Sequence, residues 1–205
     1  ASEWDDLNNT VGGRLVDMQK KAKEEYSKCE DFGTNAFLLA NELDGLCFQG
    51  RNCLMEFCDG PSVLTGGRFN FPEYSISAAS VSDVQAGVTF AKDHNIKLSV
   101  RTSGHNYMGS NNAIGGLKIF TRNLEKFSSD GLVTHSDSCG TITKDAVKVG
   151  GGELWGEVYA AVGETRHIVG GGGLTVSAAG GWLAGSGLSS TSRKYGMGVD
   201  NVLDF

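Results

Sequence analysis

The chain has little proline, no basic block and no long apolar run. Only two of its 205 residues are proline, and its net charge of −6 comes without any cluster of lysine or arginine. We expect no nucleic-acid partner, because such partners require a concentrated positive surface. No apolar stretch reaches the roughly 18 residues that a membrane-spanning helix needs, so we expect no membrane span.

Several common motifs are also missing. There is no G-x-x-x-x-G-K-[ST] stretch, which excludes a P-loop, and no G-x-S-x-G elbow of a serine hydrolase. The run Gly185-Ser186-Gly187-Leu188-Ser189-Ser190 approaches G-x-G-x-x-G, but serine replaces the third glycine. It also lies too near the chain end for a Rossmann βαβ unit. A nicotinamide dehydrogenase is therefore disfavoured.

The cysteines indicate an oxidising compartment. None forms a C-x-x-C pair, which disfavours zinc, and we expect no metal. We expect disulfides in a secreted or secretory-pathway protein, with buried free thiols as the alternative. Four cysteines allow three pairings and leave one over. The five are Cys29, Cys47, Cys53, Cys58 and Cys139.

Two features near the start of the chain agree with this compartment. Asn8-Asn9-Thr10 is an N-glycosylation acceptor sequence, which makes Asn8 the predicted glycosylation site. The chain begins abruptly at Ala1 without a signal peptide, so we expect a processed mature end.

Glycine is abundant and clustered. The chain has 30 glycines, about twice the usual share of ~7%. They gather at residues 150–152, 170–173 and 180–187. Collagen and disorder are excluded, because no three-residue period is present and apolar residues are plentiful. Clustered glycine indicates backbone held close to a ligand or to itself.

The residue pattern changes at about residue 65. Residues 1–65 are expected to form a loop-rich, cysteine-containing extension with one or two helices. A stripe of Leu15, Met18 and Ala22 predicts the first, and residues 37–46 are a candidate second. Residues 66–205 alternate between strands and helices, which predicts a mixed α+β fold.

Two helices are expected in the second part. Ser82 and Gln85 form a capping box for a helix over 83–94. Its apolar face would comprise Val81, Val84, Val88 and Ala91. A second helix over 153–162 would carry the stripe Leu154, Val158 and Ala161.

Three strands are expected beside these helices. In residues 96–101, Ile96, Leu98 and Val100 alternate with polar residues, which predicts a half-buried strand. Residues 116–120 and 146–149 are expected to form the other two.

A histidine among small residues is the most informative feature. His105 lies in Arg101-Thr102-Ser103-Gly104-His105-Asn106-Tyr107-Met108-Gly109-Ser110, directly after the expected strand. Such small residues would let backbone N–H groups approach a diphosphate closely. The alternative is an ordinary surface-loop histidine.

From about residue 72 to 205, the chain resembles the FAD-binding domain of the p-cresol methylhydroxylase and vanillyl-alcohol oxidase superfamily. It is most similar to the berberine-bridge-enzyme-like oxidases. The segments that match in order and spacing are 82–85, 101–109, 116–119, 149–156 and 192–203. Residues 4–15 and 119–124 resemble a secreted, isoamyl-alcohol-oxidase-like branch. The resemblance implies a p-cresol-methylhydroxylase-type FAD-binding domain of two α/β lobes over 66–205.

The resemblance also implies how FAD is held. His105 would be bonded covalently to the flavin 8α-methyl group, and both glycine-rich loops would bind the cofactor. The other cofactor-binding residues implied are Arg101, Thr102, Ser103, Gly104, Asn106, Tyr107, Gly109, Ser110, Gly173, Thr175, Ala178, Ala179, Gly180, Gly185 and Gly187. Leu174 stands where many relatives have the cysteine that forms a second flavin bond. A single attachment is therefore implied.

The implied activity is oxidation of an alcohol, sugar or similar small molecule, with oxygen as acceptor. Family members continue well beyond Phe205, so we expect the end of the FAD domain and the substrate domain to be missing. No catalytic base is assigned, and a second chain completing the domain is one expected partner. The alternative is a non-catalytic structural or interaction module that keeps the fold.

Overall fold

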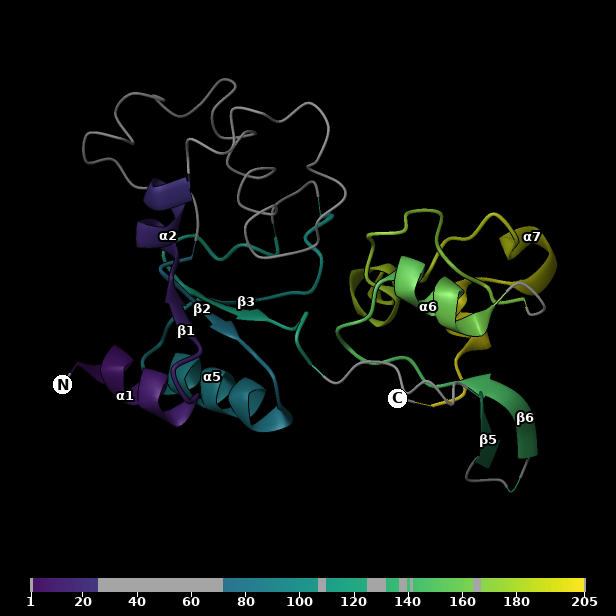
Figure 1. Cartoon of the computed structure of the whole chain (residues 1–205), viewed down its shortest axis with the longest axis horizontal. Coiled ribbons are helices and arrows are strands. Elements are labelled where there is room, and N and C mark those ends of the chain that lie inside the picture. The colour runs from purple at the N-terminus through teal and green to yellow at the C-terminus, as the bar shows by residue number, and fades with distance from the viewer. Residues whose placement is uncertain are drawn as a thin grey trace. The chain divides into compact units, whose positions relative to one another are not determined.

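The computed structural model describes residues 2–25, 72–106, 110–124, 132–136, 140, 142–163 and 167–204. The chain divides by its contacts into two compact units, Ala1–Leu124 and Glu125–Phe205 (Figure 1). All five cysteines and the predicted helix over 37–46 lie outside the described residues. Among the described residues, no helix combines the length and the apolar character needed to span a bilayer.

A four-stranded sheet forms the centre of the first unit. Its order is β1-β2-β4-β3. The bounds are Leu15–Asp17 for β1, Tyr74–Ser77 for β2, Leu98–Arg101 for β3 and Leu117–Phe120 for β4. The strands β2, β4 and β3 are parallel, whereas β1 pairs with β2 in the antiparallel sense. The predicted strands over 96–101 and 116–120 are confirmed as β3 and β4.

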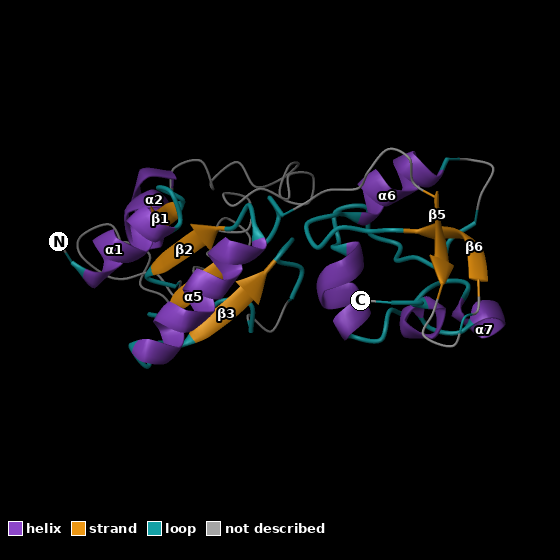
Figure 2. Ribbon diagram, turned by 90° about the horizontal axis from the view of Figure 1, so that it is seen from below, coloured by secondary structure: helices purple, strands orange, loops and turns teal. Residues whose placement is uncertain are grey.

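Helix α5 (Val81–Asp93) connects β2 to β3 and lies against one face of this sheet (Figure 2). Gly87 brings the helix close to the strands. A Cβ atom at Gly87 would lie 2.7 Å from Ile76 Cδ1 and 3.1 Å from Ile119 Cδ1. Both isoleucines are fully buried. The core of the unit is therefore the layer between α5 and the middle strands.

The start of α5 corrects one prediction. Ser80 is the N-cap, with its Oγ accepting from Asp83 N at 3.3 Å, while Asp83 Oδ2 accepts from Ser80 N at 3.1 Å. The capping box expected at Ser82 is wrong, because Ser82 already lies inside the helix. The expected apolar face is confirmed in part: Ala91 is buried and Val84 packs against the core, whereas Val81 is 71% exposed and Val88 47%.

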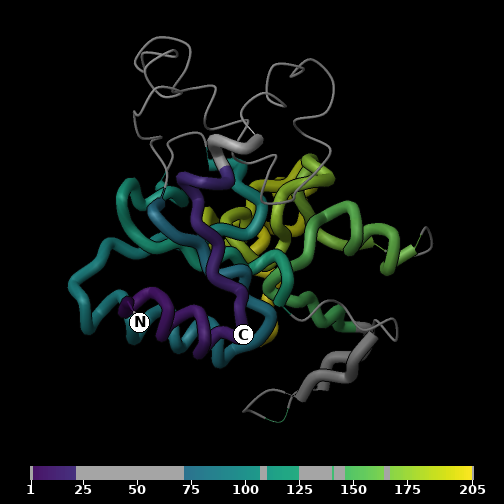
Figure 3. The backbone as a smooth tube through the Cα atoms, turned by 60° about the vertical axis from the view of Figure 1, so that its left-hand side comes forward, coloured from purple at the N-terminus to yellow at the C-terminus, as the bar shows by residue number. Residues whose placement is uncertain are grey.

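The first eighteen residues belong to this same core. Helix α1 (Glu3–Thr10) runs alongside α5 and buries Leu7 against the cluster around Ile76 (Figure 3). The ring of Trp4 lies 4.3 Å from that of Tyr74, centroid to centroid. Leu15 lies in β1 rather than in the predicted helix, and α2 is Met18–Glu25. The described part of the extension is thus mostly regular structure, and the boundary at residue 65 stays a prediction.

Strand β3 shows the predicted alternation, but its polar side is the buried one. Ser99 is 6% exposed and Arg101 2%, whereas Leu98 is 36% exposed and Val100 57%. Val100 pairs with Ile119 and shares its face of the sheet. Helix α5 packs over β2 and β4. It therefore covers β3, the last strand in the sheet order, less completely on the face that carries Leu98 and Val100.

The second unit has less regular structure. Strands β5 (Leu132–Ser136) and β6 (Ile142–Val147) form an antiparallel pair. They are followed by α6 (Trp155–Val162), the π-helical turn η2 (Ala178–Trp182), α7 (Ser192–Tyr195) and η3 (Gly198–Asn201).

The core of the second unit consists of Trp155, Val158, Val162 and Ala178. The predicted helix over 153–162 is confirmed as α6. Ala161 is exposed, because Trp155 and Val162 define the inward face instead.

Candidate functional site

The His105 loop begins at the carboxyl ends of two parallel strands. Such ends are where ligands bind in open α/β sheets. Thr121, directly after β4, donates its backbone N–H to the Arg101 carbonyl at 2.8 Å. The hydroxyl oxygens of Thr102 and Thr121 lie 2.6 Å apart. Two hydrogen bonds therefore fix the start of the loop to the end of β4.

Gly104 makes the sharp turn in front of His105. Its φ of +88° lies in the left-handed region that favours glycine. The Arg101 guanidinium lies directly beside it, because a Cβ atom at Gly104 would come within 2.6 Å of Arg101 Cζ and Nε. The backbone conformation therefore favours glycine at this position, and the guanidinium occupies the space beside it.

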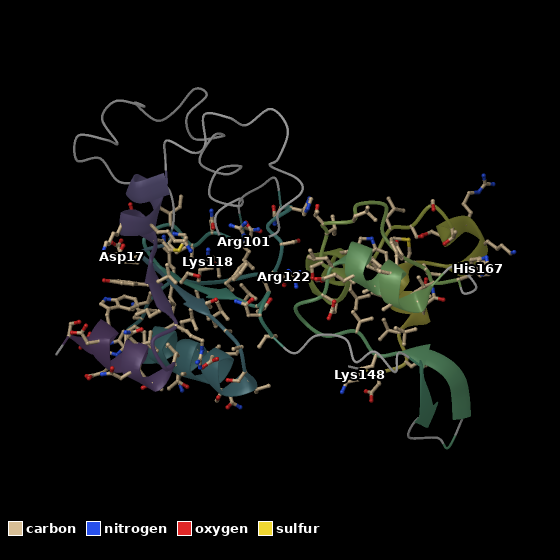
Figure 4. All side chains as sticks on the ribbon, viewed as in Figure 1. Asp17, Arg101, Lys118, Arg122, Lys148 and His167 are labelled. Carbon is tan, nitrogen blue, oxygen red and sulfur yellow. The ribbon has the colours of Figure 1, made fainter. Side chains whose placement is uncertain are left out.

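Arg101 and Lys118 lie on the face of the sheet away from α5 (Figure 4). Both are buried, with Arg101 2% exposed and Lys118 0%. Lys118 Nζ lies 4.0 Å from Met18 Sδ and 5.6 Å from the Phe120 ring centroid. This face therefore holds two buried basic side chains, and only the guanidinium of Arg101 lies beside Gly104.

The rest of the loop is more open. His105 is half-buried, and Asn106 is exposed. Asn106 Nδ2 donates to Ser110 Oγ at 2.5 Å. Tyr107 and Gly109 lie outside the described residues. The other predicted residues, Arg101, Thr102, Ser103, Gly104, His105, Asn106 and Ser110, lie together at this end of the sheet.

The N-terminus of α5 follows the end of β2, but the carboxylate of Asp83, in the first turn of the helix, already occupies this position. Asp83 Oδ2 accepts from Ala79 N at 2.9 Å, and Asp83 Oδ1 lies 2.5 Å from Arg14 Nη2. Burial raises the pKa of Asp83, but hydrogen bonds from Arg14 and the helix cap outweigh it and lower the pKa below its ordinary value. The His105 loop is therefore the better candidate for an anionic ligand.

Two tryptophans explain several glycines of the second unit. A Cβ at Gly171 would lie 2.8 Å from Trp155 Nε1 and 2.9 Å from Trp182 Nε1. A Cβ at Gly187 would lie 2.8 Å from the Trp182 ring, and one at Gly198 would collide with it. The two indoles meet edge to face, with centroids 4.8 Å apart. These glycines are required for packing.

Other glycines have open space above them. Among the described atoms, none lies within 4 Å of a Cβ placed at Gly172 or Gly181. Gly173 and Gly185 are likewise exposed. Gly172 and Gly181 lie in the glycine clusters of the sequence, but sequence alone does not separate a glycine that packs from one that leaves its backbone accessible.

The other predicted residues of this stretch differ in exposure. Thr175, Ala179 and Gly180 are half-buried, and Ala178 is 5% exposed in the core. Ser177 caps the turn η2, with its Oγ accepting from Gly180 N at 3.0 Å. The hydrogen bond between Ser177 and Gly180 and the burial of Ala178 therefore hold this glycine-rich segment in place at η2.

Helix α6 fixes the glycine-rich segment that follows it. Tyr159 Oη donates to the Gly171 carbonyl at 2.5 Å, and burial raises the pKa of this phenol. Gly156 N donates to the Leu174 carbonyl at 2.8 Å. The Leu174 side chain is 62% exposed, and no thiol is present at this position for a second flavin bond.

Asn8, the predicted glycosylation site, lies in α1. It is half-buried, and its Oδ1 accepts from Leu15 N at 3.1 Å. This hydrogen bond engages the amide oxygen of Asn8, whereas a glycan would attach to the amide nitrogen. Glycosylation at Asn8 stays a prediction.

Comparison with known proteins gives the family. The family described as "FAD binding domain" matches residues 72–205. The chain belongs to this family of FAD-binding domains. FAD is therefore its cofactor, as the sequence predicted, and the fold is the α+β FAD-binding domain of the p-cresol methylhydroxylase and vanillyl-alcohol oxidase superfamily.

Individual relatives are named as an FAD-linked oxidoreductase and a VAO-type flavoprotein oxidase. FAD-linked oxidoreductase phmC of Phaeosphaeria nodorum is 29% identical over 100% of this chain and 47% of its own length. The VAO-type flavoprotein oxidase VAO615 of Thermothelomyces thermophilus is 30% identical over 99% of this chain and 37% of its own. The chain spans less than half the length of these relatives.

A solved structure confirms the fold. The VAO-type flavoprotein MtVAO615 of Myceliophthora thermophila C1 superposes with a TM-score of 0.74 at 29% identity. The match covers 99% of this FAD-binding chain and 39% of that one.

The residues present suit FAD. The turn at Gly104 has a positive φ that favours glycine, and the buried guanidinium of Arg101 beside it favours a negatively charged group at the loop. A dinucleotide with a diphosphate is such a group. In the second unit, Gly172 and Gly181 leave backbone accessible to a ligand.

Proposed function

We propose that this protein is an FAD-dependent oxidase whose flavin is bonded covalently to a single histidine, His105. The observation that carries the proposal is the position of His105. It follows a turn whose positive φ favours glycine, at the carboxyl end of parallel strands, in a chain of an FAD-binding family. Its imidazole is half-buried, so it is held by the loop yet open to a ligand.

The chain's own residues have distinct roles in this proposal. Residues 102–110 hold the diphosphate, with Arg101 supplying positive charge behind them. The glycine-rich stretch from Gly173 to Gly187 runs along the ribityl chain and ring, with Gly173, Gly181 and Gly185 exposed and Gly187 packed on Trp182. When bound, FAD supplies two-electron redox chemistry.

His105 gives the cofactor its single covalent link. Its imidazole nitrogen would hold the flavin at the 8α-methyl carbon. This bond would cost the imidazole its N–H proton and the methyl group one hydrogen, with dioxygen as the two-electron acceptor and hydrogen peroxide as its product. Leu174 has no nucleophilic atom, so no second bond forms in that loop.

Substrate and compartment are part of the same proposal. We infer a small alcohol, sugar or similar donor and oxygen as acceptor, in a secreted, disulfide-bonded protein of the berberine-bridge-enzyme-like branch. The word oxidase in the name of the Thermothelomyces relative supports the acceptor. The cysteines and the Asn8 acceptor sequence support the compartment.

Acid precipitation tests the covalent link. We expect the pellet of the wild-type protein to keep its yellow colour and that of His105→Ala to lose it. The matched control is His167→Ala, which removes an exposed histidine of the second unit and should keep the colour (Figure 4). Flavin found entirely in the wild-type supernatant would refute the covalent bond and leave FAD binding intact.

A non-catalytic interaction module is the second candidate. It is favoured by the exposed apolar side chains of Leu98 and Val100 on the last strand of the sheet order. One stable assembly that takes up no FAD would support this function. A co-purifying second polypeptide, with flavin bound, would instead support an oxidase completed by a partner chain.

A further inference from the structure

We propose that Tyr159 is a positioning residue for the cofactor: its hydroxyl holds the Gly171 carbonyl against α6 and thereby turns the Gly172 N–H outward as a hydrogen-bond donor to FAD. The inference rests on the proposed contact between the glycine-rich stretch and the ribityl chain and ring. It deepens that contact, because it names a backbone donor and the side chain that directs it.

The orientation of one peptide group carries the inference. The Gly171 carbonyl accepts from Tyr159 Oη at 2.5 Å. No cis peptide bond occurs among the described residues. In a planar trans peptide, the carbonyl and the N–H of the next residue point in opposite directions. Because the Gly171 oxygen points toward Tyr159 of α6, the N–H of Gly172 points away from that helix.

The surroundings of Gly172 are open. It is exposed, and none of the described atoms lies within 4 Å of a Cβ placed there. Within the described part of the chain, no acceptor bonds its N–H. Gly171, the residue before it, is buried. At this point the chain therefore passes from packed backbone to backbone whose donor is available to a ligand.

Tyr159 holds the segment where the backbone of α6 does not. Farther along the segment, Gly156 N at the start of α6 donates to the Leu174 carbonyl at 2.8 Å. At Gly171 the hydrogen bond comes from a side chain instead. Burial raises the pKa of the Tyr159 phenol, so its hydroxyl keeps its proton and remains a donor. A single hydroxyl therefore fixes the direction of this peptide.

A second donor lies beside the same backbone. Trp155 Nε1 is buried and has no hydrogen-bond acceptor among the described residues. It would lie 2.8 Å from a Cβ placed at Gly171. A buried donor without an acceptor is costly, so a chain that lacks the Tyr159 hydroxyl would gain by turning this peptide toward Trp155. Glycine at both positions permits that turn, which would redirect the Gly172 N–H.

The test measures FAD binding in the whole chain carrying His105→Ala, which removes the proposed covalent link and makes binding reversible. Tyr159→Phe is added to this background and titrated with FAD at equal folded fraction by circular dichroism. We expect about fivefold weaker binding, the usual effect of one hydrogen bond. The matched control is Tyr195→Phe, which removes the hydroxyl of an exposed tyrosine of α7 and should stay within about twofold.

The bound flavin supplies a readout that fold stability alone would not change. At saturating FAD, we expect the visible circular dichroism of the flavin to change in Tyr159→Phe, because a redirected Gly172 N–H alters the surroundings of the ring. Tyr195→Phe should leave this spectrum unchanged. Weaker binding of FAD by Tyr159→Phe with an unchanged saturated spectrum would show a general effect on the fold and overturn the positioning role.

A double-mutant cycle tests whether Tyr159 acts through Gly172. Gly172→Pro removes the N–H itself. We expect Tyr159→Phe to weaken binding by less than about twofold once proline is present, because the group that the hydroxyl directs is gone. If Gly172→Pro does not fold, the saturated spectrum of Tyr159→Phe decides: a changed spectrum supports the inference, and an unchanged one overturns it.

The remaining outcomes are distinct. Unchanged affinity in Tyr159→Phe, equal weakening by Tyr195→Phe, strict additivity with Gly172→Pro, or no uptake of FAD by the His105→Ala chain would each overturn the role of Tyr159. The expected weakening together with a colourless wild-type pellet after acid precipitation would support this inference while refuting the covalent link at His105. The two failures are therefore distinguishable.

Discussion

At the scale of single residues, the glycines of the second unit differ in what surrounds them. We expect Gly198→Ala to lower the free energy of unfolding by about 1–3 kcal/mol, because the new methyl would collide with the Trp182 ring in a packed core. Gly181→Ala is the matched control, since the described atoms leave open space there. Denaturant unfolding measures both, and equal loss in the two variants would contradict the packing argument.

Asp83 predicts a dependence of stability on pH. Its pKa in the folded protein is lowered, so the carboxylate stabilises the fold above its unfolded pKa of about 3.9, and this contribution is lost as the pH falls through the folded pKa. We expect Asp83→Asn to destabilise clearly at neutral pH and progressively less below about pH 4. Urea unfolding at a series of pH values measures the difference.

The control for Asp83 is Asp93→Asn, which changes an exposed carboxylate of the same helix. Its effect should be small at every pH. A destabilisation by Asp83→Asn that stays constant down to about pH 2 would show that the ion pair with Arg14 does not act through the charge.

At the scale of elements, the start of α5 can be tested with two neighbouring serines. Ser80→Ala removes the hydroxyl that accepts from Asp83 N, and we expect a loss of about 1 kcal/mol. Ser82→Ala removes a hydroxyl inside the exposed first turn and should change stability by less than about 0.5 kcal/mol. Thermal unfolding ranks the two, and the reverse order would restore the cap predicted from the sequence.

The elements also show how far the sequence could predict the fold. Periodicity identified α5, α6, β3 and β4, because each has a local repeat of apolar residues. It misplaced the cap, since Ser80 and Ser82 offer the same chemistry within two residues. Periodicity could not predict which side of β3 is buried, because burial depends on where α5 packs and not on the residues of the strand itself.

The candidate site was predictable to a similar extent. His105 and its small neighbours stand out in the sequence, and the structure places the described ones at the carboxyl end of β3. The contact between Arg101 and Gly104 was not predictable, because it depends on a side chain folding back beneath a turn three residues later. Nor could the sequence separate Gly172 from Gly187 in the second unit.

At the scale of the whole molecule, the first residues and residues 72–124 form one cooperative core. Deleting residues 1–13 removes the burial of Leu7 and Val11, each worth about 1.5–3 kcal/mol. We therefore expect the first unit to lose much of a total stability that is typically about 5–15 kcal/mol. Calorimetry of the truncated chain measures this loss.

The control for the deletion is Trp4→Phe, which keeps an aromatic ring against Tyr74 and should cost far less. An unchanged unfolding profile after deletion would mean that α1 is a dispensable addition to the sheet. The expected loss would instead place residues 3–13 inside the folding unit that carries the His105 loop.

The positions of the three tryptophans have an optical consequence. Trp4 lies in the first unit, whereas Trp155 and Trp182 lie in the second. Indoles emit at longer wavelengths once water reaches them, so the Trp4→Phe protein reports the emission of the second unit alone. Subtracting it from wild type isolates the first unit. Flavins absorb at the wavelengths at which indoles emit. Quenching of the two tryptophan signals would therefore report FAD binding separately for the first and the second unit.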